Sequence, residues 1–151
     1  IAQLKASMIE PNGQTFASLV SIKSGVRVQA WQRTTPVHFT RDAAMDVFNS
    51  TQVYDWGVPE GQSGPPILGT FAQIIRPSML DVFNASNLVT YCDQPTGVPN
   101  FNLIWPYTNI HFYNLYKPGA SPLEFHIWLI GFEYLNGQPR LYSMEQVLWS
   151  P

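Results

Sequence analysis

The sequence predicts a mainly β fold in a single domain, residues 1–151, with an α+β arrangement as the alternative. Strand-like runs rich in β-branched and aromatic residues recur along the chain, and an Asn-Gly pair near the C-terminus marks a tight hairpin. Helix signals are confined to two short segments. We therefore expect one antiparallel barrel or strongly curved sheet, with two short helices and a C-terminal hairpin.

The expected strands follow one another from the N-terminus. In chain order they are QLKASMI, FASLVSIK, VRVQAWQ, TQVYDW, FAQII, NLVTYC, TNIHFYNLY, EFHIWLIGFEYL and RLYSMEQVLW. A first hairpin is expected around Ser24 and Gly25. The two longest connections, residues 57–69 and 92–106, are rich in Pro and Gly and too long for tight turns, which is typical of binding loops.

The two expected helices contain a repeated tetrad, Asp-Val-Phe-Asn. It occurs in RDAAMDVFNSTQV at residues 41–53 and in RPSMLDVFNASNL at residues 76–88. Thr40 suits the cap of the first helix and Pro77 the first turn of the second. Each copy therefore predicts about two turns of helix that dock a phenylalanine, end at an asparagine in a left-handed cap, and lead into a strand.

Each tetrad also begins an N-x-S/T triplet. Asn49 and Asn84 are therefore candidate glycosylation sites, with helix capping as the alternative and preferred interpretation. Asp46 and Asp81 could be imagined as a catalytic carboxylate pair, but nothing brings them together in the sequence. We expect both to be solvated surface acids.

Charge and hydropathy exclude several classes of protein. Charged residues make up 12% of the chain, and its eight basic residues form no cluster, so it lacks the basic stripe that nucleic-acid binding requires. The longest strongly apolar run, FHIWLIGF from Phe125, is too short to span a bilayer. We expect a soluble protein with no nucleic-acid partner and no membrane span.

The cysteine count does not determine the cellular compartment of the protein. Cys92 is the only cysteine, so the chain has no intrachain disulfide and no cysteine-based zinc cluster. The sequence begins at Ile1, which favours a secreted or processed protein without excluding the cytoplasm. Cys92 itself is expected to be a small buried residue at the end of a strand.

The C-terminal hairpin gives the most detailed prediction, because its Asn-Gly turn fixes which residues face one another. The expected facing pairs are Leu135 and Gln138, Glu133 and Arg140, Trp128 and Glu145, and His126 and Val147. One face of the hairpin is then continuously apolar and suits the core. The other face mixes aromatic residues with acid and base groups, which is typical of a small-molecule pocket.

This mixed face supplies the candidate site. The expected catalytic residues are His126, Glu145, His111 and Tyr113, and the expected ligand-binding residues are Trp128, Phe132, Trp105 and Trp149. A histidine beside a carboxylate can move a proton near neutral pH, and a tyrosine hydroxyl can stabilise developing negative charge. Each histidine alone is equally well explained as an ordinary sheet residue.

The leading hypothesis is a domain that binds a small apolar or aromatic molecule, either without chemistry or as a cofactor-free isomerase, cyclase or lyase. The three histidines share no short metal-ligand spacing, so neither a metal nor a cofactor is expected. One alternative is a secreted carbohydrate-recognition module with Trp56 and Trp105 exposed on its loops. Another is a subunit of a capsid, filament or homo-oligomer.

Overall fold

The computed structural model describes all residues except 32–33, 60–62, 94–108, 122–123 and 150–151, and omits the side chain of Trp149. Its elements are α1 (Ala2–Ile9), α2 (Gly13–Leu19), β1 (Val26–Gln29), β2 (Val37–Phe39), α3 (Arg41–Met45), β3 (Tyr54–Asp55), β4 (Leu68–Gly69), α4 (Phe71–Phe83), β5 (Val89–Cys92), β6 (His111–Pro118), β7 (Phe125–Leu135) and β8 (Gln138–Trp149). Strand accounts for 38% and helix for 26% of the described residues, so the mainly β prediction is confirmed.

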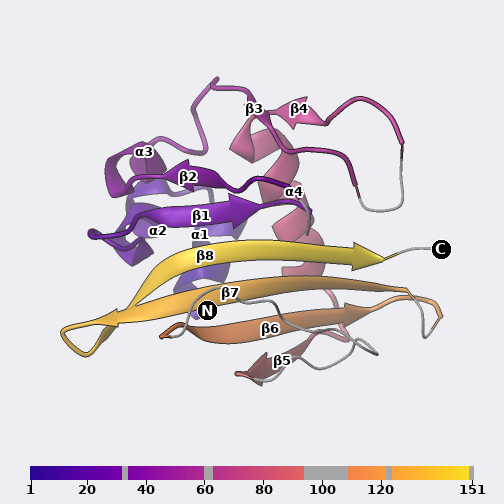
Figure 1. The fold of residues 1–151 in the computed structure, drawn as a ribbon. Helices are drawn as coiled ribbons and strands as arrows, with labels where there is room; N and C mark the ends of the chain where they lie inside the picture. Colours follow the sequence, from indigo (N-terminus) through magenta and orange to yellow (C-terminus); the bar gives the residue numbers. More distant parts are fainter. Residues whose placement is uncertain (32–33, 60–62, 94–108, 122–123, 150–151) are drawn as a thin grey trace.

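Six strands form one curved, open sheet in the order β2-β1-β8-β7-β6-β5 (Figure 1). β1 runs parallel to β8, and every other pair in the sheet is antiparallel. The sheet is therefore mixed rather than purely antiparallel. No pairing closes β2 onto β5 among the described residues, so the curved-sheet form of the prediction holds and the barrel form does not.

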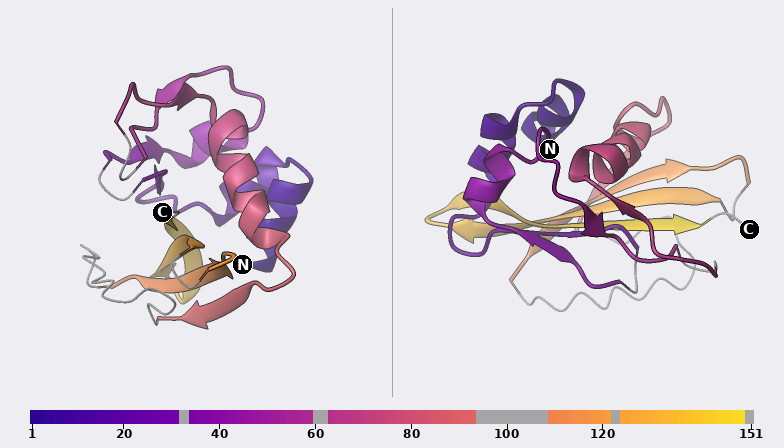
Figure 2. Two further views of the ribbon diagram at one scale, coloured as in Figure 1. Left: turned by 90° about the vertical axis from the view of Figure 1, so that its right-hand side faces the viewer. Right: turned by 90° about the horizontal axis from the view of Figure 1, so that it is seen from above.

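The helices gather on one face of the sheet, as the view from above shows (Figure 2). Two of them replace predicted strands, because α1 covers the segment QLKASMI and α2 covers the first half of FASLVSIK, up to Leu19. Leu4 and Met8 are four residues apart and both buried, which is the spacing of one helix face. Asn12 caps α2 by accepting a hydrogen bond from the backbone N–H of Thr15.

α4 is the longest helix and corrects three predictions. It begins at Phe71, within the predicted strand FAQII, so Pro77 lies inside the helix rather than in its first turn. Thr70 and Gln73 form a capping box at its start. Asn84, at its end, has φ −94° rather than a left-handed conformation. The shorter α3 begins at Arg41, and the side chain of Thr40 caps it as predicted.

The β7–β8 hairpin follows the predicted register only near its turn. Asn136 and Gly137 both have positive φ, and Glu133 faces Arg140. A β-bulge at Gly131 and Phe132 then shifts the pairing by one residue. Since side chains alternate between the faces of a strand, this shift moves every later β8 residue to the other face.

The main core lies between the helices and the sheet. Edge-to-face and tilted aromatic contacts link Phe16, Phe39, Phe48 and Phe71 within it. A second buried cluster, made of Phe125, Ile127, Leu129 and Val147, lies on the other face of the sheet. None of the helices in the described ranges has the length and apolar character needed to cross a membrane.

Candidate functional site

Two histidine–aspartate pairs lie at opposite ends of the β6–β7 pair. His126 faces Lys117 across the strands, whereas His111 faces Phe132. These two positions are six residue steps apart along β7, which is roughly 20 Å at 3.3 Å per residue. His111 and His126, both expected catalytic residues, therefore do not come together, and each histidine belongs to its own cluster.

The first cluster joins α4 to the sheet around His126. The His126 Nδ1 atom lies 2.8 Å from Asp81 Oδ2, and Lys117 Nζ donates to Asp81 Oδ1 at 2.6 Å. The His126 Nε2 atom lies 3.2 Å from Ser78 Oγ and 2.9 Å from Gln146 Nε2. Both ring nitrogens of a nearly buried histidine, 8% exposed, therefore have polar partners.

These contacts fix the proton on the imidazole ring. The Gln146 amide nitrogen can only donate, so His126 Nε2 must accept and carries no proton. The proton is then on Nδ1, where it is donated to the Asp81 carboxylate. Trp128 Nε1 donates to Ser78 Oγ at 3.2 Å. The single lone pair of His126 Nε2 therefore faces two donors, the Gln146 amide at 2.9 Å and the Ser78 hydroxyl at 3.2 Å. The Gln146 contact is the shorter of the two, and Ser78 shares the same acceptor.

Burial and the neighbouring charges set the pKa values of this pair. Burial lowers the pKa of His126 below its usual value, and the opposing effect of Asp81 does not offset it. Burial would raise the pKa of Asp81, but the hydrogen bonds from Lys117 and His126 outweigh it and the net pKa is lowered. A neutral imidazole beside an ionised carboxylate is the favoured state at neutral pH.

Glu145 is not part of this cluster, contrary to the prediction. The bulge places it opposite Leu129, on the face of the sheet that carries the second buried cluster. Gln146 occupies the predicted place of Glu145, opposite Trp128. Burial raises the pKa of Glu145 to about 7. The acid that contacts His126 is Asp81, which is exposed as predicted but also bonds to the imidazole.

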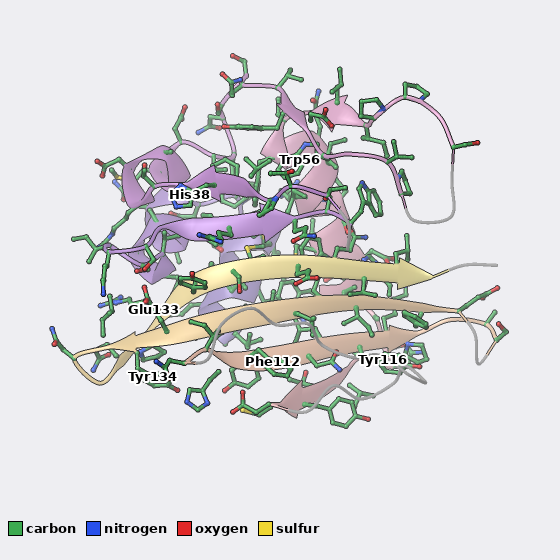
Figure 3. All side chains as sticks on the ribbon, in the orientation of Figure 1. His38, Trp56, Phe112, Tyr116, Glu133 and Tyr134 are labelled. Atoms are coloured by element: carbon green, nitrogen blue, oxygen red, sulfur yellow. The ribbon has the colours of Figure 1, made fainter. Side chains whose placement is uncertain are left out.

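The second cluster surrounds a pocket at the turn end of the hairpin. The cavity is about 150 Å³ and is lined by Ile1, Cys92, His111, Tyr113, Phe132, Tyr134 and Pro139. Tyr134, labelled in Figure 3, packs edge-to-face against the ring of His111. Tyr113 and Phe132 make a second edge-to-face contact. Two predicted catalytic residues and one predicted ligand-binding residue therefore share this wall.

Asp93 holds His111 at the pocket. Its carboxylate lies 2.8 Å from His111 Nδ1 and also accepts the backbone N–H of Phe112. The hydrogen bond from His111 is the main reason that the pKa of Asp93 is lowered. Asp93 has φ 52°, a conformation that Asp tolerates better than most residues. Cys92, beside it, is exposed rather than buried as predicted.

A larger pocket of about 440 Å³ lies next to this one. The two share Ile1, Phe132 and Pro139 in their walls. The larger pocket adds the charged side chains of Arg41 and Arg140, contributed by α3 and β8. The turn end of the sheet therefore offers an aromatic compartment beside a compartment with positive charge.

The remaining predicted residues do not join either cluster. Trp128 is fully buried under α4 and cannot line an open pocket. Trp56 is also buried, with its Nε1 bonded to Gly69 O between α4 and the β3–β4 pair (Figure 3). Trp105 and the side chain of Trp149 lie outside the described residues. The asparagines of both N-x-S/T triplets are exposed.

A comparison with known protein families, curated proteins and solved structures found no match to this chain. Within the described ranges, no three His, Cys, Asp or Glu side chains form a group that could hold a metal ion.

Proposed function

We propose that this chain binds a small aromatic molecule in the pocket beside His111, with His111 and Asp93 available for cofactor-free acid–base chemistry. The supporting observation is the pocket wall, where Tyr113, Phe132 and Tyr134 surround a histidine fixed by a carboxylate. Small-molecule sites commonly combine aromatic walls with a few convergent polar groups. Tyr113 is the hydroxyl available to stabilise negative charge on a bound ligand.

The dimensions support a single aromatic ring in this pocket. Its volume of about 150 Å³ is that of a cavity able to hold one benzene-sized ring. The adjoining compartment of about 440 Å³ has room for the rest of a modest ligand. Arg41 and Arg140 line this second compartment, and guanidinium groups bind carboxylates through paired hydrogen bonds. An aromatic ring carrying a short acidic chain fits both compartments.

Phenylpyruvate is a suitable probe because it has a ring, a carboxylate and exchangeable protons beside a carbonyl. Proton NMR in D₂O would measure both its binding and the exchange of those protons. We expect the protein to bind the probe and to accelerate the exchange. His111→Ala should remove most of the acceleration, because His111 is the base in the pocket wall.

Two further variants separate binding from chemistry. Cys92→Trp fills the pocket from an exposed lining position and should abolish binding. His38→Ala is the matched control, since His38 is an exposed histidine on β2, outside the pocket. Binding that survives Cys92→Trp would rule out this pocket as the site. Exchange that survives His111→Ala would rule out the catalytic role of His111.

A further inference from the structure

The side-chain contacts around His126 resemble the arrangement of a nucleophilic serine site. A serine hydroxyl faces one nitrogen of the imidazole at 3.2 Å, and a carboxylate faces the other at 2.8 Å. In this arrangement the histidine takes the serine proton during attack, and the carboxylate holds the ring in the required tautomer. Ser78 and Asp81 are three residues apart on α4, so one face of the helix presents both to His126.

The local structure fixes each member of this triad. Lys117 binds the second oxygen of Asp81 and so limits rotation of the carboxylate. Trp128 donates to Ser78 and positions its oxygen, while its own ring is fully buried. Gln146 requires His126 Nε2 to be an acceptor. Every contact comes from residues that the structure describes.

The three residues of the triad differ in exposure. Ser78 is partly exposed on α4, and the Asp81 side chain is 48% exposed at the same edge. His126, beneath them, is mostly shielded from water. A shielded base beside the hydroxyl of a partly exposed serine fits a nucleophilic site.

We propose that Ser78, His126 and Asp81 form a nucleophilic site that hydrolyses small esters through an acyl-serine intermediate. Ser78 Oγ attacks the ester carbonyl carbon and passes its proton to His126 Nε2. The bond from carbon to the alcohol oxygen breaks, and the alcohol leaves with that proton. Water then attacks the acyl group, again through His126, and restores the Ser78 hydroxyl. The sum is ester plus water giving acid plus alcohol.

This site is independent of the aromatic pocket, about 20 Å away along the sheet. The Gln146 amide is the side-chain N–H donor beside the site that keeps a hydrogen for the developing oxyanion. Its nitrogen has two hydrogens, of which only one can point at His126 Nε2. Loss of such a donor typically slows acyl transfer by about 100-fold.

A small alkyl fluorophosphonate tests the proposal directly. The reagent reacts with an activated serine, loses fluoride and leaves a phosphoryl group that intact mass spectrometry detects. We expect one adduct per chain, located on Ser78 by peptide mapping of the wild-type protein. Because the map uses the folded wild type, it decides the question even if a variant fails to fold. Absence of an adduct, or an adduct on another residue, overturns the proposal.

Three variants test the roles in the triad. Ser78→Ala should eliminate labelling, and His126→Gln should slow it by roughly 100-fold or more, as expected for loss of a general base. Ser86→Ala is the matched control, an exposed serine just beyond α4 that should label like the wild type. Circular dichroism would establish that each variant is folded. Labelling of a folded His126→Gln at the wild-type rate overturns the assignment.

The pH profile gives a second signature. The groups facing His126 are Asp81 and Ser78 from α4, Lys117 from β6 and Gln146 from β8. Protonation of His126 removes the base, so labelling should fall on acidification. The midpoint is expected below 6.5, because burial lowers the histidine pKa. A labelling rate that does not change between pH 4 and pH 8 would contradict the mechanism.

Discussion

The two histidine–aspartate pairs have the same contact and different surroundings. In each, a histidine Nδ1 lies 2.8 Å from an aspartate oxygen. The His126 side chain is 10% exposed and is bridged by the carboxylate to a helix, whereas the His111 side chain is 62% exposed and its partner is a residue of the adjoining strand end. Burial rather than the contact itself distinguishes the two pairs.

This difference separates the functions that each pair suits. A buried histidine with a fixed tautomer can act on a neighbouring group of the protein, in this case Ser78. An exposed histidine in a pocket wall can act on a molecule that enters from solvent. The packing around each pair should therefore respond differently to substitution, and the following predictions test that difference.

The largest expected effect is on stability at the His126 end. Trp128→Ala removes a fully buried indole between α4 and the sheet, and should cost about 3–5 kcal/mol in the free energy of unfolding. Tyr134→Ala removes a ring that is 55% exposed at the other end, and should cost at most about 1 kcal/mol.

Urea denaturation followed by circular dichroism measures both values. If Trp128→Ala unfolds the protein outright, the result still agrees with the expectation that Trp128→Ala is the more destabilising of the two variants. Equal losses for the two variants would instead mean that the two ends are packed alike, and the comparison between the pairs would lose its basis.

The sequence predicted the hairpin turn and the sheet but missed half of the helical structure. The signals for α4 were present, since Phe71, Ile75 and Met79 recur every four residues after the capping box at Thr70. The short segment FAQII alone fits a strand equally well. The error came from dividing one amphipathic helix at Pro77, a residue that the helix tolerates in its interior.

The composition of the site could not be predicted in the same way. A bulge of one residue between Gly131 and Phe132 reverses the face on which Glu145 lies. A glycine inside a strand often accompanies a bulge, but it does not by itself establish that the register shifts there. The contact of Asp81 with His126 joins residues 45 positions apart. Such a contact depends on how α4 crosses the sheet, which alternation and spacing within one segment do not determine.

The second prediction concerns Glu145, a half-buried acid whose pKa shift is caused by burial. Its pKa rises from 4.5 to about 7, which corresponds to about 3 kcal/mol at about 1.36 kcal/mol per pKa unit. Between these pH values the unfolded chain has lost the proton that the folded chain keeps, so stability falls as pH rises and then levels off.

Glu145→Gln should therefore stabilise the protein by up to about 3 kcal/mol at pH 8 and change little at pH 4. Thermal or urea unfolding at the two pH values provides the measurement. A variant that is equally destabilised at both would show that the ionisation of Glu145 does not oppose folding, and burial would no longer explain the behaviour of the acids in this sheet.

The smallest effect is on the titration of His126, measured by NMR of its ring protons. The folded pKa is below the unfolded value of about 6.5 because of burial, and Asp81 partly opposes that effect. Asp81→Asn removes the charge but keeps the shape, so the pKa of His126 should fall further. As pH drops below 6.5 the unfolded chain gains a proton before the folded chain does, so acid should destabilise this variant more than the wild type.

Asp93→Asn, at the exposed pair, is the matched control and should leave the His126 titration unchanged. An unchanged or higher pKa of His126 in Asp81→Asn would mean that Asp81 does not interact with the imidazole charge, which would remove both the contrast between the two pairs and the carboxylate from the proposed triad.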